Sequence, residues 1–193
     1  DLLPSAQGND DVTEKKKLTS VRDSVKILGI CKKINKTLVQ EQKLIVLVRL
    51  FELIDADKNY SPQRMAILNT VAEAFNVEKT EFESVQNYIK NPGFAIDSNL
   101  MVINDQEVSG DIPFKHLRIE SIDKSIMVLR IPSVDLYLLK YNGNDSITLN
   151  GMGVNKERVY VLAKGSSIKL PRSKPVFYSD IASRYLSELH ASH

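Results

Sequence analysis

The stretch Asn91-Pro92-Gly93 is the point at which the hydrophobic pattern of this chain changes its period. Before it, apolar residues recur every three or four positions, as in the segment LIVLVRLFELI at residues 44–54. After it, apolar residues alternate with polar ones or form short runs, as in LYLLKY at residues 136–141. A period of about 3.6 is typical of amphipathic helices, and a period of about 2 is typical of half-buried strands. The sequence therefore predicts a helical domain followed by a β domain.

The composition is that of an ordinary globular protein. The chain has 193 residues, of which 42% are hydrophobic and 26% charged, and its net charge is +2. Nothing in this balance indicates nucleic acid or a membrane surface as a ligand. Cys31 is the only cysteine, which excludes an internal disulfide and is typical of a reducing cytoplasm. No apolar run approaches the roughly 20 residues that a membrane-spanning helix needs. Because the chain begins with Asp1 rather than Met, we expect it to be a piece of a longer protein.

A domain of about four helices is predicted at residues 20–92, preceded by a linker at residues 1–19. The linker prediction rests on Pro, Gly, clustered Asp and three consecutive Lys in that segment. The first helix carries Val25, Leu28 and Cys31 on one face. Helical spacing of apolar residues indicates a face that packs against the rest of the domain, so we expect these three side chains to be buried.

Capping patterns mark the starts of the later helices. Thr37 with Gln40 resembles a capping box, and Ser61 followed by Pro62 is typical of a helix start. Between these two starts, the segment at residues 44–54 is apolar on most sides, which predicts the central buried helix. The fourth helix is expected to end at the break described above.

The second half is predicted to be a small β-sandwich at residues 97–181, followed by a C-terminal helix or tail at residues 182–193. The expected strands are 100–103, 116–122, 125–131, 136–141, 146–149, 158–162 and 167–170. The dipeptides Asn142-Gly143, Asn150-Gly151 and Lys164-Gly165 lie between them. Asn and Gly tolerate positive φ, so these dipeptides are typical of hairpin turns. Short strands at this spacing favour a sandwich.

The turn between the second and third helices carries two candidate metal ligands, Asp55 and Asp57. With Asn59 and Ser61 they form an alternating oxygen-bearing pattern, as in the first half of a calcium loop. A complete loop also needs a glycine at its sixth position and a glutamate at its twelfth, and both are missing here. We therefore expect no strong calcium site, and at most a shallow cation site at the two aspartates.

No catalytic triad, activated nucleophile or phosphate-binding glycine loop is apparent in the sequence, so it favours a binding or regulatory module over an enzyme. The sandwich loops are the expected surface for a protein partner. The candidate contact residues in these loops are Asn142, Asn150, Gly151, Arg158, Lys164 and Ser166. An acidic or phosphorylated partner would be held by Arg158, Lys164 or Lys169.

The segment LIVLVRLFELIDADKNYSPQRMAILNTVAEAFNV at residues 44–77 resembles the tellurite-resistance TerB-like helical domain. That family has an acidic turn between two helices, and its acidic residues are implicated in metal binding. Asp57 matches the acidic position and Ser61 the cap, whereas Lys58 and Arg64 stand where the family has glycine and glutamate. The resemblance implies a TerB-like helical bundle, with Asp55 and Asp57 as its metal-binding residues.

The β half resembles part of a forkhead-associated (FHA) domain. The matching features are His116, the strands at 136–141 and 158–162, the Asn150-Gly151 turn and Gly165. The resemblance implies a small FHA-like β-sandwich. The Gly-Arg-Ser turn and the serine with which the family reads phosphothreonine are not found upstream of these features. Because a phosphate needs charge-assisted donors, we expect no selection of phosphothreonine peptides.

The order of segments resembles the N-terminal region of large ABC transporter ATP-binding proteins of Bacteroidetes-type bacteria. The resemblance covers about residues 20–185. The segments that carry it are SVRDSVKILGICKKINKTL, QKLIVLVRLFELI, SVDLYLLKYNGNDSITLNG, RVYVLAKGSSIKL and PVFYSDI.

This last resemblance implies a non-catalytic, cytoplasmic regulatory or scaffolding region that acts through protein–protein contacts. It would lie at the cytoplasmic face of the inner membrane, in contact with other domains of the parent transporter or with a separate protein. ATP and Mg would belong to the parent protein, and no cofactor is expected in this piece. The alternative is a TerB-like metal or stress-response sensor that binds a divalent cation at Asp55 and Asp57.

Overall fold

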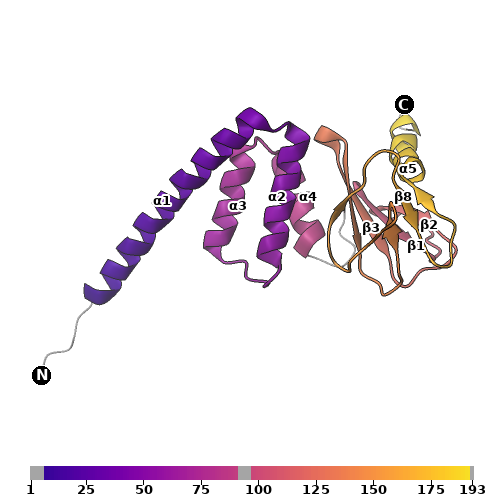
Figure 1. The fold of residues 1–193 in the computed structure, drawn as a ribbon, viewed down its shortest axis with the longest axis horizontal. Helices are drawn as coiled ribbons and strands as arrows, with labels where there is room; N and C mark the ends of the chain where they lie inside the picture. The colour runs from indigo at the N-terminus through magenta and orange to yellow at the C-terminus, as the bar shows by residue number, and fades with distance from the viewer. Residues whose placement is uncertain (1–6, 91–96, 192–193) are drawn as a thin grey trace, which may run out of the picture. The chain divides into compact units, whose positions relative to one another are not determined.

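The computed structural model describes the backbone of residues 7–90 and 97–191, and it is a mixed α/β protein with helices first and strands after (Figure 1). The described residues form five α-helices and two β-sheets, which confirms the order predicted from the change of hydrophobic period. The chain divides into two compact units, Asp1–Phe82 and Glu83–His193. The predicted break at Asn91-Pro92-Gly93 lies outside the described residues.

Helix α1 spans Gln7–Thr37, so the linker predicted at residues 1–19 is corrected to helix from Gln7 onward. After Gly8 the sequence has no further Gly or Pro until Gly29, and the Glu and Lys residues between them are strong helix formers. Composition typical of a solvated segment therefore also supports a helix here.

The buried face predicted for α1 is only partly buried. Cys31 is covered as expected, but Val25 is 64% and Leu28 48% exposed. The reason is length, because α1 has 31 residues whereas its packing partner α3 has 13. Figure 1 shows the N-terminal half of α1 extending past the other helices of this unit.

Helix α2 spans Gln40–Asp55, and its N-cap is Val39 rather than the predicted Thr37. The Val39 amide donates to the side chain of Gln42 at 3.1 Å. The Thr37 hydroxyl instead donates to the Lys33 carbonyl at 3.2 Å, at the end of the preceding helix. A threonine that completes one helix is not available to cap the next.

Helix α3 spans Pro62–Ala74 and begins as predicted, because Ser61 accepts a hydrogen bond from the Arg64 amide. Its last carbonyls, which have no partner inside the helix, accept side-chain amides from elsewhere in the unit. Asn35 donates to the Ala74 carbonyl and Gln40 to the Phe75 carbonyl. Helix α4 follows at Lys79–Lys90. The core of the first unit consists of Cys31, Leu44, Leu47, Val48, Phe51, Leu68, Val71, Ala72, Phe75 and Phe82.

The first sheet of the second unit has the strand order β2-β1-β3-β4-β7. These strands are β1 Leu100–Asn104, β2 Lys115–Arg118, β3 Ile126–Ile131, β4 Leu136–Tyr141 and β7 Tyr160–Val161. Strand β2 is parallel to β1, and the other pairs are antiparallel.

The second sheet has the order β6-β5-β8-β9, with all pairs antiparallel. Its strands are β5 Thr148–Leu149, β6 Met152–Gly153, β8 Ser167–Lys169 and β9 Val176–Phe177. Two of these strands, β6 and β9, are absent from the sequence-based prediction. Each has only two residues, which is too short for an alternating pattern to be visible.

Both sheets and the last helix, α5 at Tyr178–Ala191, contribute to one hydrophobic core. Alternate residues of β1, β3 and β4 meet residues of β5, β8 and β9 in this core, as expected for two stacked sheets. The members from the strands and from α5 are Met101, Ile103, Ile126, Val128, Tyr137, Leu139, Tyr141, Leu149, Ile168, Val176, Ile181 and Tyr185. The helix predicted near the C-terminus is thus an integral part of the β unit.

The last turn of α4 also belongs to the second unit. The Tyr88 hydroxyl donates to the Met127 carbonyl at 2.8 Å, and the buried ammonium of Lys140 donates to the Tyr88 carbonyl at 2.6 Å. The unit therefore starts at Glu83, earlier than the predicted boundary at residue 97. Among the helices of the described residues, none combines the length and the apolar character needed to cross a bilayer.

Candidate interaction site in the loops of the second unit

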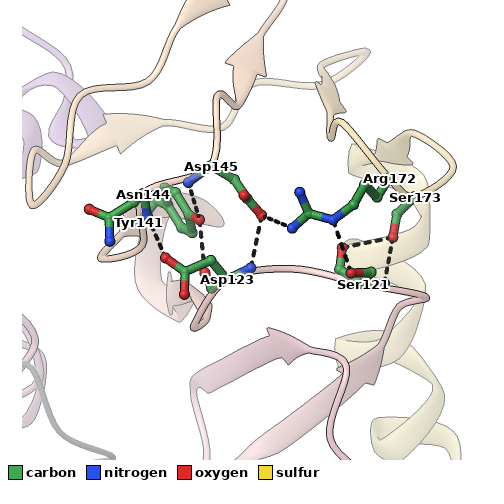
Figure 2. Close-up of polar contacts among 7 residues, drawn as sticks. All are labelled: Ser121, Asp123, Tyr141, Asn144, Asp145, Arg172 and Ser173. Atoms are coloured by element: carbon green, nitrogen blue, oxygen red, sulfur yellow. Dashed lines mark hydrogen bonds and ion pairs between the residues drawn. The ribbon is translucent and has the colours of Figure 1, made fainter.

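Three loops that are far apart in the sequence are joined by one polar network (Figure 2). Asp145 is at its centre, because its carboxylate accepts a hydrogen bond from the Asp123 amide and an ion pair from Arg172, both at 2.8 Å. The Asp123 carboxylate in turn accepts the Asn144 amide. The amide bond from Asp123 and the Arg172 guanidinium hold the pKa of Asp145 below its usual range. The network thus fixes the loop after β4 against the turn before β3.

The same network extends to the loop before β9. Arg172 donates to the Ser121 hydroxyl at 3.2 Å. Ser173 exchanges two hydrogen bonds with the backbone of Ser121, accepting from its amide and donating to its carbonyl. Figure 2 shows Arg172 lying between Asp145 and Ser121. The loops are therefore held in one arrangement before any partner binds.

One of the predicted contact residues, Asn142, lies beside this network. Asn142 accepts a hydrogen bond from the Ser125 amide, so its side chain supports the turn. The next residue, Gly143, is buried where a Cβ atom would lie 2.1 Å from the Asp123 carbonyl and 2.2 Å from the Tyr141 hydroxyl. Only glycine fits at such a distance, so the position is dictated by the network.

Three other predicted contact residues, Asn150, Gly151 and Ser166, lie close together in the structure. The Asn150 amide group donates to the Ser166 hydroxyl at 3.2 Å and accepts from the Ser167 amide at 3.0 Å. Asn150 and Gly151 both have positive φ, 52° and 81°, which is why Asn-Gly occurs here. Ser166 is buried, so it shapes the turn and does not face a partner directly.

The two predicted cations of these loops are exposed. The Arg158 guanidinium lies over the Tyr160 ring at 5.9 Å from its centre, a cation–π geometry. Lys164 extends from the turn that also holds Gly165, which has a φ of 79°. Both cations are placed where a negatively charged partner can reach them.

The two predicted metal ligands of the helical unit are occupied by groups of the chain itself. Asp55 accepts the Lys58 ammonium at 2.7 Å and the Tyr60 hydroxyl. Asp57 binds the Arg64 guanidinium through both oxygens, at 2.8 and 2.9 Å, and also accepts the Asn59 amide. A cation at this turn would have to displace these partners.

The hydrogen bonds to Asp57 also affect its protonation. The amide of Asn59, followed by the side chain of Arg64, lowers the pKa of Asp57. Among the side chains that the structure describes, no group of three or more His, Cys, Asp or Glu residues is placed to hold a metal ion.

His116 is placed by the sheet in a polar contact that the sequence did not indicate. Its Nε2 lies 2.7 Å from the Asn104 side-chain oxygen, while the Asn104 amide group donates to the Ser125 hydroxyl. An amide oxygen only accepts, so His116 donates through Nε2. Burial, followed by the charges of Arg184 and Arg118, lowers the pKa of His116.

Asp123, Asp145 and Arg172 are not among the contact residues predicted from the sequence. No local spacing signals them, because 27 residues separate Arg172 from Asp145, and only the fold brings them together. The chain matches no protein-family model, no curated protein and no solved structure.

Proposed function

We propose that this chain is a non-catalytic regulatory or scaffolding region of an ABC-type transporter ATP-binding protein, and that it acts through protein–protein contacts. The helical unit would correspond to the TerB-like domain and the β unit to the FHA-like domain. In this proposal, ATP and Mg are bound by the parent protein, at the cytoplasmic face of the membrane.

The observation that carries the proposal is the prearranged loop surface of the second unit. Asp145, Asp123 and Arg172 hold three loops in one arrangement, and Asn150 with Ser166 holds a fourth turn. Binding to a surface that is already ordered costs less conformational entropy than ordering it on contact. Fixed loops that carry exposed cations suit a docking surface for another domain or protein.

Site-specific photo-crosslinking in the native cell tests this proposal. A photoreactive amino acid replaces exposed Lys164 in the loop surface, and in a matched control it replaces exposed Ser187 on α5. We expect the Lys164 position to capture transporter domains, identified by mass spectrometry, and the Ser187 position not to capture them. Equal capture at both positions, or capture only of proteins unrelated to transport, contradicts the proposal.

The coding sequence downstream of His193 provides an independent test. The proposal requires a nucleotide-binding P-loop and membrane-spanning segments there. A reading frame without them rejects the transporter assignment, whatever the crosslinking shows.

A further inference from the structure

Strand β2 leaves one side of its backbone unpaired. Its neighbour is β1, and the Ile119 amide continues that parallel ladder by donating to the Asn104 carbonyl at 2.9 Å. In a parallel ladder alternate residues direct their backbone groups to the same neighbour. Leu117 and Ile119 therefore face β1, whereas Arg118, the last residue of β2, faces away from it. Glu120 lies beyond the strand, at a bend of the chain. Within the described part of the chain, the backbone groups of Arg118 and Glu120 make no hydrogen bond.

This unpaired edge opens onto a groove of about 580 Å³, here called the β2 groove. Its walls are residues 117–120, residues 173–176 and the first turns of α5. The walls at residues 117–120 and 173–176 are joined at one end by the hydrogen bonds between Ser121 and Ser173 (Figure 2). The groove is thus a fixed gap beside a free strand edge, at the border of the two sheets.

The dimensions and the apolar lining suit an extended peptide. The four residues of β2, Lys115–Arg118, span about 13 Å, since an extended strand rises about 3.3 Å per residue. Leu117 and Ile119 are partly buried against the shared core, and Val176, a buried member of that core, also belongs to the lining of the groove. A strand added to an edge obtains its affinity from main-chain hydrogen bonds and its specificity from such side-chain contacts.

The charges of the β2 groove favour an acidic occupant. In the described residues, Lys174 and Arg184 make no hydrogen bond or ion pair with any carboxylate. Of the two lining carboxylates, Asp180 accepts a hydrogen bond from the amide of Phe177, the residue before α5. Glu120 is the other, and it is exposed. The wall formed by α5 and its preceding loop thus carries two cations, Lys174 and Arg184, against the single carboxylate of Asp180.

We propose that the β2 groove binds an extended, acidic segment of a partner protein as an added strand. The segment pairs with the backbone of Arg118 at the edge of β2 and places carboxylates near Lys174 and Arg184. This goes beyond the proposed function, because the groove does not include the candidate contact residues of the loops. A partner of any class can supply the segment, so the groove and the transporter assignment can fail independently.

A phage library of random 12-residue peptides, selected against the full chain, tests the proposal. We expect enriched sequences in which apolar and acidic residues alternate. One enriched peptide is then synthesised, and its affinity is measured by calorimetry. Selection of no peptide, or of basic peptides, contradicts the proposal.

Arg118→Pro is the decisive variant, with Arg118→Ala as its matched control. Both remove the same side chain, but proline also removes the N–H that faces the groove. Proline is tolerated at an edge strand when its nitrogen faces away from the ladder, as it does here. We expect the peptide to bind at least about tenfold more weakly to Arg118→Pro than to Arg118→Ala. Equal affinities would show that the peptide does not pair with β2.

Two further measurements keep the proposal testable if Arg118→Pro does not fold. In the unmodified chain, the bound peptide should slow hydrogen exchange of the Arg118 amide. The double variant Lys174→Glu/Arg184→Glu should bind about tenfold more weakly, with a reduced dependence on salt. Unchanged hydrogen exchange would reject the addition of a strand. Unchanged affinity of the double variant would reject recognition by charge.

Light scattering of the peptide-free chain tests whether a second copy of the chain, and not a partner peptide, occupies the β2 groove. A dimer that Arg118→Pro abolishes and Arg118→Ala preserves would show that the edge pairs with another copy of this chain. That result would overturn the acidic-peptide assignment.

Discussion

The hydroxyl of Tyr141 donates a hydrogen bond of 2.8 Å to the carbonyl of Asp123, and so joins the end of β4 to the turn before β3. The same hydroxyl accepts the Asp145 amide at 3.1 Å. Burial raises the pKa of Tyr141, so the hydroxyl keeps the proton that it donates. A single side chain thus connects two of the loops that form the candidate interaction site.

Gly143→Ala should destabilise the fold. Its Cβ atom would lie 2.1 Å from the Asp123 carbonyl, which is backbone and cannot move aside cheaply. We expect the free energy of unfolding to fall by about 1–3 kcal/mol, as for other overpacked sites. Urea denaturation measures this change. Gly153→Ala is the matched control, because nothing lies within 4 Å of its Cβ position, and it should change stability by less than about 0.5 kcal/mol. Equal effects of the two substitutions would mean that the turn is not packed as described.

The stability of the second unit should decrease on acidification. Burial and the nearby arginines lower the pKa of His116 in the folded chain, below its unfolded value of about 6.5. Between these two pKa values the unfolded chain binds more protons, so the free energy of unfolding rises with pH. The stabilisation is complete above pH about 6.5 and is lost as pH falls through the folded pKa. Thermal melts at about half-unit intervals between roughly pH 5 and 8 measure this change in stability.

His116→Gln is the control for this prediction. Glutamine can donate a hydrogen bond to Asn104 as the imidazole does, but it does not titrate. The pH dependence in this window should be smaller in the variant. A profile identical to that of the unmodified chain would assign the effect to other groups.

Asn150 should act in stability rather than in phosphopeptide recognition. Asn150→Ala places a residue with Cβ at a positive φ of 52° and removes the bonds to Ser166 and Ser167. We expect a loss of about 1–3 kcal/mol, and a smaller loss for Asn150→Gly, which tolerates that φ. Selective enrichment of phosphothreonine peptides by the unmodified chain, lost in Asn150→Ala, would assign it a recognition role.

Calcium should not shift the melting temperature of the chain strongly. Asp57 is bound by Arg64 through both oxygens, and a metal ion would have to replace that guanidinium. Removing the competitor by Arg64→Gln should strengthen whatever weak binding exists. Calorimetric titration of both forms checks this. A large shift at micromolar calcium in the unmodified chain, abolished by Asp57→Ala, would support the metal-sensor alternative.

A fragment that starts at Glu83 should be more stable than one that starts at Asp97. The shorter fragment lacks Tyr88, whose carbonyl accepts the buried ammonium of Lys140 and whose hydroxyl bonds to Met127. A hydrogen bond to a charged group contributes about 1.5–3 kcal/mol. Denaturation of residues 83–193 and 97–193 gives the comparison, and equal stabilities would place the boundary where the sequence predicted it.

Much of the local structure was predictable because its signals are local. The Ser61-Pro62 start of α3, the extent of β4 and the Asn150-Gly151 turn follow from capping, alternation and tolerance of positive φ. Other local patterns had competing outcomes. Thr37 completes α1 instead of capping α2, and the charged segment after Gly8 forms a helix instead of a linker.

The sequence by itself determined that helices precede strands, because the period of apolar residues is a property of neighbouring positions. Only the tertiary structure decided which polar groups meet. Asp145 reaches Arg172 across 27 residues, and the unpaired edge of β2 lies beside the first turns of α5, which is the last helix of the chain's second unit. Contacts of this kind depend on strand order and on the packing of two sheets. The pattern of a single strand contains neither, so the candidate site and the β2 groove became visible only in the folded chain.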